Sequence, residues 1–234
     1  MDCLLVALDV DKAVEACALA DRLRGVVGGF KIGSRLFTSH GPSIVEALVA
    51  RGDRVFLDLK VHDIPNTVVG AVRAATRLGV WMVNVHASGG EAMMRAAREA
   101  ADDESSRLGR PRPLVIAVTV LTSLDEAALR QIGVAATMTE QVERLAVLAQ
   151  AAGLDGVVAS PHEIGRIRLR CGKTFTILTP GIRAPDDAKG DQRRTMTAAE
   201  ALAAGANYLV VGRPIISAAD PRAAAERIAE ECFP

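Results

Sequence analysis

The stretch FLDLKVHDIPNT, residues 56–67, combines the pattern of a buried strand with three charged side chains. It begins with large apolar residues and then places Asp58, Lys60 and Asp63 within six positions. Asp58 and Lys60 are two residues apart, so in a strand their side chains point to one face while the neighbouring leucines point to the other. Burying charges is costly unless they are paired, which favours a functional site at the end of this strand.

Short apolar runs of this kind occur eight times, with stretches of helical spacing between them. Several runs are nearly continuous in Val, Ile and Leu, which is typical of parallel strands covered on both faces. Eight alternations predict an α/β fold, specifically a single (β/α)8 TIM barrel over residues 1–234. A doubly wound open sheet is the alternative, and the missing GxGxxG after the first run disfavours it. The expected strands are 4–9, 28–33, 55–60, 81–86, 114–121, 154–160, 175–180 and 207–212.

Composition excludes several classes of protein. The chain has 28 basic and 28 acidic residues and no net charge, which argues against a nucleic-acid-binding surface. Its four cysteines show no CxxC spacing, which indicates reduced, buried thiols and not a zinc site or a disulfide framework. The N-terminus lacks the pattern of a signal peptide, and no run of 18 apolar residues is present, so we expect a cytoplasmic protein without a membrane segment.

Polar side chains gather at the ends of the expected strands. Barrel enzymes build their active sites at the C-terminal ends of the strands, so these residues are candidates for one site. Four charges from the first three strands are expected to alternate in one small volume, where each ammonium and carboxylate favours the charged form of its neighbour. A structural ion pair between Asp58 and Lys60 is the alternative. The strand-end residues are Asp9, Lys31, Asp58, Lys60, Asn84, His86, Thr122 and Ser123.

Two further residues have competing interpretations. Asp63 precedes IPNT, so it could cap a helix that begins near Pro65. His86 is interpreted as a hydrogen-bonded residue at a strand end, because no second histidine is suitably spaced for a metal. We therefore predict no metal site.

The loops after the last two strands indicate an anionic ligand. Barrels often bind phosphate with these loops. Gly212 permits close approach of the backbone, and Arg213 offers a forked donor to phosphate oxygens. The residues predict a phosphorylated substrate whose reactive part lies over the first three strands.

Seven blocks resemble the orotidine 5′-phosphate decarboxylase family in the order that the family has them. Residues 57–68, LDLKVHDIPNTV, resemble its DxKxxDIPNT signature. The resemblance extends from about residue 4 to residue 220. The other blocks are VALD (6–9), FKIG (30–33), VTVLTS (118–123), TPGIR (179–183), GDQRR (190–194) and VVGRPI (210–215).

The resemblance implies decarboxylation of orotidine 5′-monophosphate to UMP and CO2, without a metal or organic cofactor. It implies that Lys60 protonates C6 of the pyrimidine and that Asp58 lies against the departing carboxylate. It also implies a homodimer in which Asp63 and Thr67 reach the partner's site, and a loop from Pro180 to Gln192 that closes over the phosphate. The implied catalytic residues are Lys31, Asp58, Lys60 and Asp63, and the implied substrate-binding residues are Asp9, Lys31, Asp63, Ile64, Thr67, Thr122, Pro180, Arg183, Gln192, Gly212 and Arg213.

Two other functions are alternatives to this one. A Mg2+-dependent phosphosugar decarboxylase or synthase of the same superfamily would carry a Glu where Lys31 stands. A catalytically inactive nucleotide-binding barrel would have lost Lys60 or Asp58, and both are present.

Overall fold

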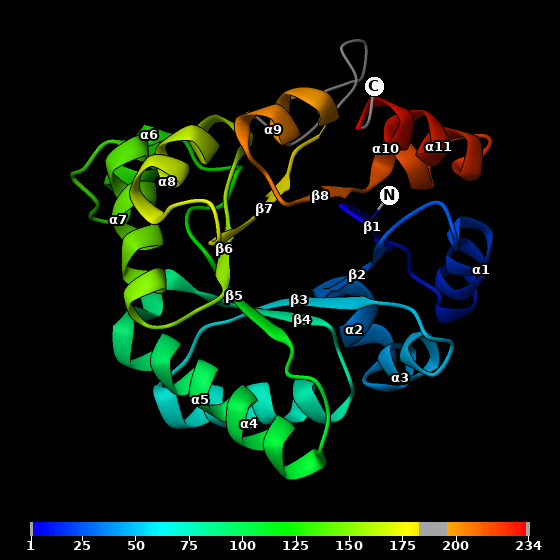
Figure 1. Cartoon of the computed structure of the whole chain (residues 1–234), viewed down its shortest axis with the longest axis horizontal. Helices are drawn as coiled ribbons and strands as arrows, with labels where there is room; N and C mark the ends of the chain where they lie inside the picture. The colour runs from blue at the N-terminus through cyan, green and yellow to red at the C-terminus, as the bar shows by residue number, and fades with distance from the viewer. Residues whose placement is uncertain (1, 183–195, 233–234) are drawn as a thin grey trace.

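The computed structural model describes residues 2–182 and 196–232, which form a closed barrel of eight parallel strands in sequence order (Figure 1). The first strand pairs with both the second and the eighth, which closes the barrel. The predicted (β/α)8 fold is therefore confirmed, and the open-sheet alternative is wrong. The strands are β1 (Leu4–Ala7), β2 (Gly29–Gly33), β3 (Val55–Val61), β4 (Met82–His86), β5 (Leu114–Val118), β6 (Gly156–Val158), β7 (Thr176–Pro180) and β8 (Tyr208–Val211).

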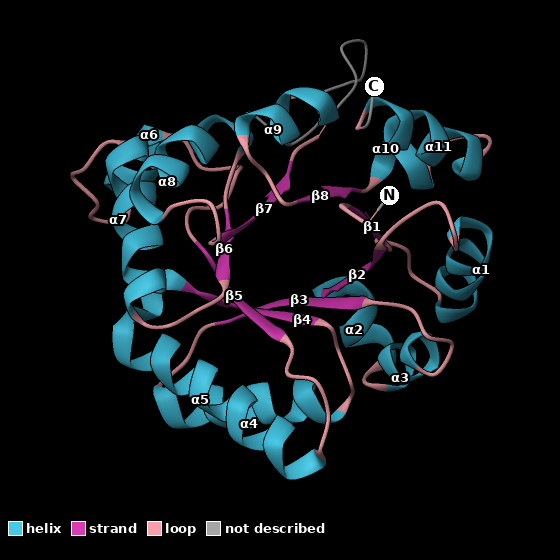
Figure 2. Cartoon of the chain, viewed as in Figure 1, coloured by secondary structure: helices cyan, strands magenta, loops and turns pink. Residues whose placement is uncertain are grey.

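Helices surround the strands on the outside of the barrel (Figure 2). They are α1 (Ala13–Leu23), α2 (Ser34–His40), α3 (Ser43–Val49), α4 (Pro65–Arg77), α5 (Gly90–Leu108), α6 (Glu126–Gln131), α7 (Met138–Ala151), α8 (Ile164–Cys171), α9 (Ala198–Ala204), α10 (Arg213–Ile216) and α11 (Pro221–Glu231), with 3-10 turns η1 (Ala87–Gly89) and η2 (Pro161–Glu163).

Two apolar layers form the core. A small cluster that includes Phe56 and Met82 fills the inside of the barrel. A much larger cluster lies between the strands and the helices, and it contains Leu57 and, partly buried, Leu59. The two leucines beside Asp58 therefore face the helices, as the strand period predicted.

Several strands are shorter than their apolar runs. The expected strand 114–121 ends at Val118, and the expected strand 154–160 is reduced to Gly156–Val158. Beyond Val118, Val120 and Leu121 line a cavity instead of extending the strand. The end of an apolar run in the sequence is therefore not the end of the strand, because apolar residues also line the mouth of the barrel.

The start of α4 differs from the capping prediction for Asp63. The helix begins at Pro65, Ile64 occupies the N-cap position, and no side chain caps it. Asp63 Oδ1 instead accepts the N–H of Ile64 at 2.6 Å. The interpretation of Asp63 as the helix cap is wrong, because Asp63 stands one residue too early to reach the free N–H groups of the first turn. By contrast, Thr137 caps α7 through a capping box with Glu140.

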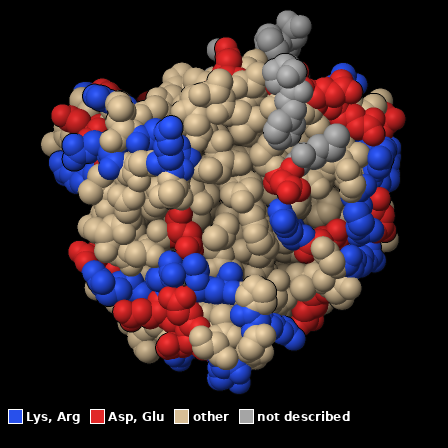
Figure 3. All heavy atoms as spheres, viewed as in Figure 1, with Lys and Arg blue, Asp and Glu red and all other residues tan. Residues whose placement is uncertain are grey.

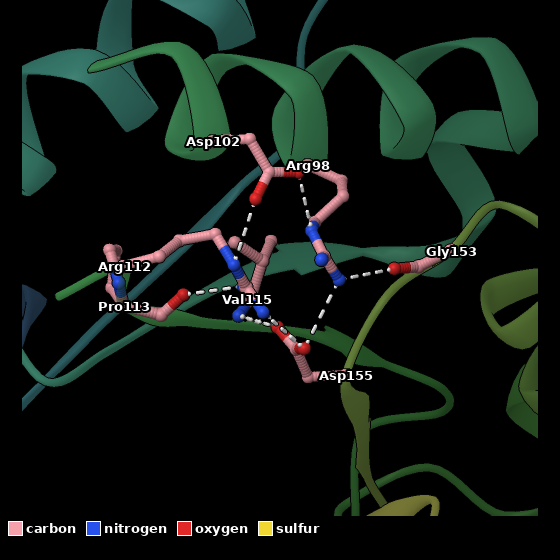
Figure 4. Close-up of polar contacts among 7 residues, drawn as sticks. All are labelled: Arg98, Asp102, Arg112, Pro113, Val115, Gly153 and Asp155. Carbon is pink, nitrogen blue, oxygen red and sulfur yellow. Dashed lines mark hydrogen bonds and ion pairs between the residues drawn. The ribbon is translucent and has the colours of Figure 1, made fainter. Parts of the chain in front are cut away.

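A network of two arginines and two aspartates ties the N-terminal ends of β5 and β6 to α5 (Figure 4). Arg112 donates two hydrogen bonds to Asp155, at 2.6 and 2.7 Å. Asp155 also accepts from Arg98 at 3.1 Å and from the Val115 N–H at 2.7 Å. Asp102 of α5 pairs with both arginines. Because the network joins one helix to two strand starts, it has the form of a structural brace.

The surface carries mixed charge, and the cysteines are free thiols. On the face shown in Figure 3, acidic and basic residues are interspersed around the rim, and the centre is mostly uncharged. Cys171 and Cys232 are buried as predicted, whereas Cys3 and Cys17 are only partly buried, so the prediction of buried thiols is wrong for these two. Within the described ranges, none of the helices has the length and apolar character that crossing a membrane requires.

Asp155→Ala should destabilise the fold without changing chemistry at the other end of the barrel. The Asp155 side chain is only 14% exposed, and its loss removes one acceptor from each of two guanidinium groups and leaves the Val115 N–H without its acceptor. Denaturant unfolding should show a loss of about 2 kcal/mol, the range for hydrogen bonds to charged groups.

Asp103→Ala is the matched control for this brace. Asp103 lies on α5, the helix that carries Arg98 and Asp102 of the brace. Its side chain is 68% exposed and pairs with Arg73 at 3.3 Å. An exposed pair of this kind contributes about 0–1 kcal/mol. Equal losses in the two variants would contradict a specific structural role for Asp155.

Candidate active site

A cavity of about 500 Å³ opens at the C-terminal ends of the strands. Its size fits a small-molecule ligand such as a nucleotide. Apolar side chains, including Phe56 and Leu178, form its floor. The charged residues that line it are Asp9, Lys31, Arg35, Asp58, Lys60 and Arg213.

Four of these charges form a continuous alternating array. Lys31 Nζ lies 3.2 Å from Asp9 Oδ1 and 3.4 Å from Asp58 Oδ2. Lys60 Nζ lies 2.7 Å from Asp58 Oδ1. The inner members, Lys31 and Asp58, have side chains 11% and 10% exposed, whereas Lys60 and Asp9 are 37% and 49% exposed. The array therefore holds a buried ion pair in the middle and presents an accessible ammonium to the cavity.

Lys60 reaches this position through an unusual backbone conformation. Its φ is +53°, and it is the one non-glycine residue with positive φ in the part of the chain that the structure describes. The pairing of β3 with β4 shifts here, so that residues 58–60 lie opposite the single residue Asn84. The left-handed region costs a side-chain-bearing residue about 1–2 kcal/mol. Strain of this size persists only where the surroundings impose it, and it concentrates at functional sites.

Three residues near the array had no assigned role in the sequence. Asn84 is completely buried and bonds both Asp58 and the backbone of Lys60. A Cβ on Gly33 would lie 3.0 Å from Lys31 Nζ, so a side chain there would press on the array. Arg35 donates to the carbonyl oxygen of Asp9 at 3.2 Å. The sequence could have indicated Gly33, because it follows Lys31 by two residues and so lies on the same face of the strand.

The structure describes four of the six substrate-binding residues that were predicted after the later strands. Thr122, Pro180, Gly212 and Arg213 line the cavity. A Cβ on Gly212 would lie 3.5 Å from Ala7 Cβ and 3.8 Å from Asp9 Oδ2, so its open side faces the array. The remaining two, Arg183 and Gln192, lie outside the described residues.

Asp63, Ile64 and Thr67 are not among the residues that line the cavity of their own chain. All three are exposed, and Ile64 is 67% exposed although it is a large apolar residue. The same twelve-residue stretch therefore places Asp58 and Lys60 in the cavity and its last residues outside it.

His86 lies beside the array, in surroundings that disfavour its charged form. Burial lowers the pKa of His86 below the usual value, and the neighbouring His62 and Lys60 lower this pKa further. Its ring stacks on that of His62, with 5.5 Å between centroids. Among residues 2–182 and 196–232, no group of three His, Cys, Asp or Glu side chains is arranged to hold a metal ion.

Lys60→Gly and Lys60→Ala should separate backbone strain from the loss of the ammonium. Both variants remove the amine, but only glycine adopts a φ of +53° without steric cost. We expect Lys60→Gly to be more stable than Lys60→Ala by about 1 kcal/mol in denaturant unfolding. A more stable Lys60→Ala would show that residue 60 is not strained.

Known proteins resemble this chain over nearly its whole length. The Orotidine 5′-phosphate decarboxylase / HUMPS family matches residues 2–228. Orotidine 5′-phosphate decarboxylase of Moorella thermoacetica is 57% identical over 231 residues, 98% of this chain and 92% of the relative. The crystal structure of orotidine 5′-phosphate decarboxylase from Lactobacillus acidophilus superimposes with a TM-score of 0.87 at 36% identity, covering 99% of each chain. With the barrel and the charged array in place, these matches show that the chain belongs to the orotidine 5′-phosphate decarboxylase / HUMPS family.

Proposed function

We propose that this protein decarboxylates orotidine 5′-monophosphate to UMP and CO2, the final step of de novo UMP synthesis. The observation that carries the proposal is the alternating array, in which the Lys60 ammonium stands at the cavity with Asp58 against it at 2.7 Å. Relatives that are named for this activity cover nearly the whole chain at 52–57% identity.

The reaction needs a fixed positive charge and a proton at one carbon atom. The bond between C6 and the carboxylate breaks, CO2 leaves, and the electron pair stays on C6. The Lys60 ammonium stabilises this developing charge and then transfers its proton to C6. Because the charge is held in place before the reaction, it stabilises the transition state without reorganisation. Solvent then reprotonates the amine, which is 37% exposed in the free protein.

Asp58 holds the proton donor in place, and Lys31 offsets part of the charge of Asp58. The Asp58 carboxylate accepts from the Lys60 ammonium at 2.7 Å. Asp58 is also the carboxylate that would lie against the substrate's carboxylate, and this like-charge contact ends when neutral CO2 leaves. Lys31 offsets the remaining charge of Asp58 and Asp9. Together with Asp9 it is assigned to the ribose hydroxyls, as the family resemblance implies.

The phosphate is assigned to the end of the cavity beside β7 and β8. Gly212 and Arg213 line this end, and an arginine fork suits phosphate oxygens. Thr122, which follows β5, and Pro180, at the end of β7, also line the cavity and are assigned to the pyrimidine and the phosphate, respectively. Arg183 and Gln192 retain the phosphate-binding roles that the family resemblance implies. Remote phosphate binding of this kind contributes energy to the chemical step.

A homodimer explains the exposed end of the FLDLKVHDIPNT stretch. Asp63 and Thr67 are functional residues by resemblance, yet they do not line the cavity of their own chain. Ile64 between them exposes apolar surface that a second copy would bury. We therefore propose that each protomer supplies Asp63, Ile64 and Thr67 to its partner's site.

The free cysteines fit a reducing compartment, and the proposed location is the cytoplasm. The proposed ligand is a nucleotide substrate, not a nucleic acid.

The Mg2+-dependent alternative is less compatible with the array. Lys31 Nζ lies between Asp9 and Asp58, at the place where a divalent cation would share those two carboxylates. A metal ion there would meet a fixed positive charge. Activity in a chelator distinguishes the two reactions.

The proposal is tested by the absorbance change when orotidine 5′-monophosphate is added to purified protein in EDTA. We expect full turnover in EDTA and conversion to UMP. Lys60→Ala should lose at least about 1,000-fold in kcat, because it removes both the proton donor and the fixed charge.

Asp103→Ala, far from the cavity, is the control for this loss and should keep wild-type turnover. Activity that EDTA abolishes and Mg2+ restores would contradict the cofactor-free reaction. Substantial turnover by Lys60→Ala would remove Lys60 from its assigned role.

Mixing two inactive variants tests the shared site. In a heterodimer of Lys60→Ala and Asp63→Ala subunits, one site recovers both native residues and the other loses both. An equal mixture refolded together should regain roughly one quarter of wild-type activity, as two-fold symmetry requires. No recovery in a mixture shown to contain heterodimers would place Asp63 in its own chain's site.

A further inference from the structure

Asn84 is a buried polar side chain directly below the charged array. It is 0% exposed, and it follows Met82 of the inner cluster by two residues, so it points into the barrel. Its neighbours Val83 and Val85 belong to the outer cluster against the helices. A polar group in this position destabilises the core unless both ends of its amide are satisfied.

Both ends of the Asn84 amide are used on the array. Nδ2 donates to Asp58 Oδ1 at 2.7 Å, and Oδ1 accepts the backbone N–H of Lys60 at 2.8 Å. A backbone N–H only donates and an ionised carboxylate only accepts, so these two partners determine the orientation of the amide. One side chain therefore connects the carboxylate of the array with the backbone of the residue that carries the ammonium.

The backbone of Lys60 depends on this acceptor. Leu57 pairs with Val83 and Val61 pairs with Val85, so β3 has three residues where β4 has only Asn84. At this point the backbones of β3 and β4 are out of register. The Asn84 side chain there accepts the N–H of Lys60. It thereby supports the left-handed conformation that turns the Lys60 side chain back towards Asp58.

We propose that Asn84 is a positioning residue that holds the Lys60 ammonium and the Asp58 carboxylate in their reactive arrangement. Asn84 is not among the residues that line the cavity, so it acts through Lys60 and Asp58 and does not touch the ligand. The inference rests on the proposed proton transfer from Lys60, and it adds the residue that positions this proton donor.

The test compares Asn84→Ala, Asn84→Ser and Asn84→Asp with Val83→Ala as the matched control. Val83 is on the same strand, 1% exposed and on the opposite face, so its truncation disturbs packing but not the array. The Asn84 variants should lose about 100-fold in kcat, the effect of misplacing a reacting group by about 1 Å. KM for orotidine 5′-monophosphate should stay near the wild-type value, because Asn84 makes no contact in the cavity.

The three substitutions differ in what they keep. Serine has a hydroxyl that can still donate to Asp58, whereas aspartate offers a second carboxylate to it. Asn84→Ser should therefore keep more kcat than Asn84→Asp. If Asn84→Ala does not fold, this order in the two polar variants decides the question. Wild-type kcat in the folded Asn84 variants, or an equal loss in Val83→Ala, would overturn the proposal.

Amide hydrogen exchange at Lys60 gives a readout that needs no substrate. The Lys60 N–H should exchange slowly in the wild type, in Val83→Ala and in Asn84→Asp, which keeps a side-chain acceptor, and roughly tenfold faster in Asn84→Ala, which has none. Unchanged exchange in Asn84→Ala would overturn the positioning role even if the protein acted on another substrate. An inactive wild type with accelerated exchange in Asn84→Ala would instead reject the proposed reaction and keep the positioning role.

Discussion

The carboxylate of Asp58 is the contact on which the rest of the site depends. Its Oδ1 accepts from Lys60 and Asn84, and its Oδ2 faces the Lys31 ammonium. With only 10% of its side chain exposed, Asp58 has lost most of its water and needs these three donors. They come from β2, β3 and β4, so the pairing of these three neighbouring strands is what assembles them.

The sequence was sufficient for the fold and for the composition of the array. Eight alternations of strand and helix leave few topologies, because parallel strands must be covered on both faces. Strand period assigned Asp58 and its leucine neighbours to opposite faces, and the rule that barrel sites lie at strand ends brought Asp9 and Lys31 to Asp58. These inferences rely on local periodicity, which the chain displays directly.

The remaining features depend on registers between strands, which no local pattern reveals. Nothing in residues 58–60 predicts that the backbone of Lys60 has a positive φ, since glycine and asparagine are the residues that usually adopt this left-handed conformation. Asn84 is a candidate by its place near a strand end, but its role is not evident until its position opposite the bulge in β3 is known. Asp63 carries the signal of a helix cap, but the helix starts at Pro65 with Ile64 before it. For Lys60 and Asn84 a tertiary contact decided between two locally acceptable alternatives, whereas for Asp63 the starting residue of the helix decided.

The two ends of the barrel use the same carboxylate chemistry for different purposes. At the N-terminal end, Asp155 is held by two arginines, whose guanidinium groups are forked, planar and permanently charged. At the C-terminal end, Asp58 is held by two lysines, whose ammonium groups can give up a proton. Arginine at position 60 would bind Asp58 at least as firmly, yet it could not protonate a carbanion. The choice of lysine therefore distinguishes a network built to transfer a proton from one built to hold strands together, even though both bury an aspartate among cations.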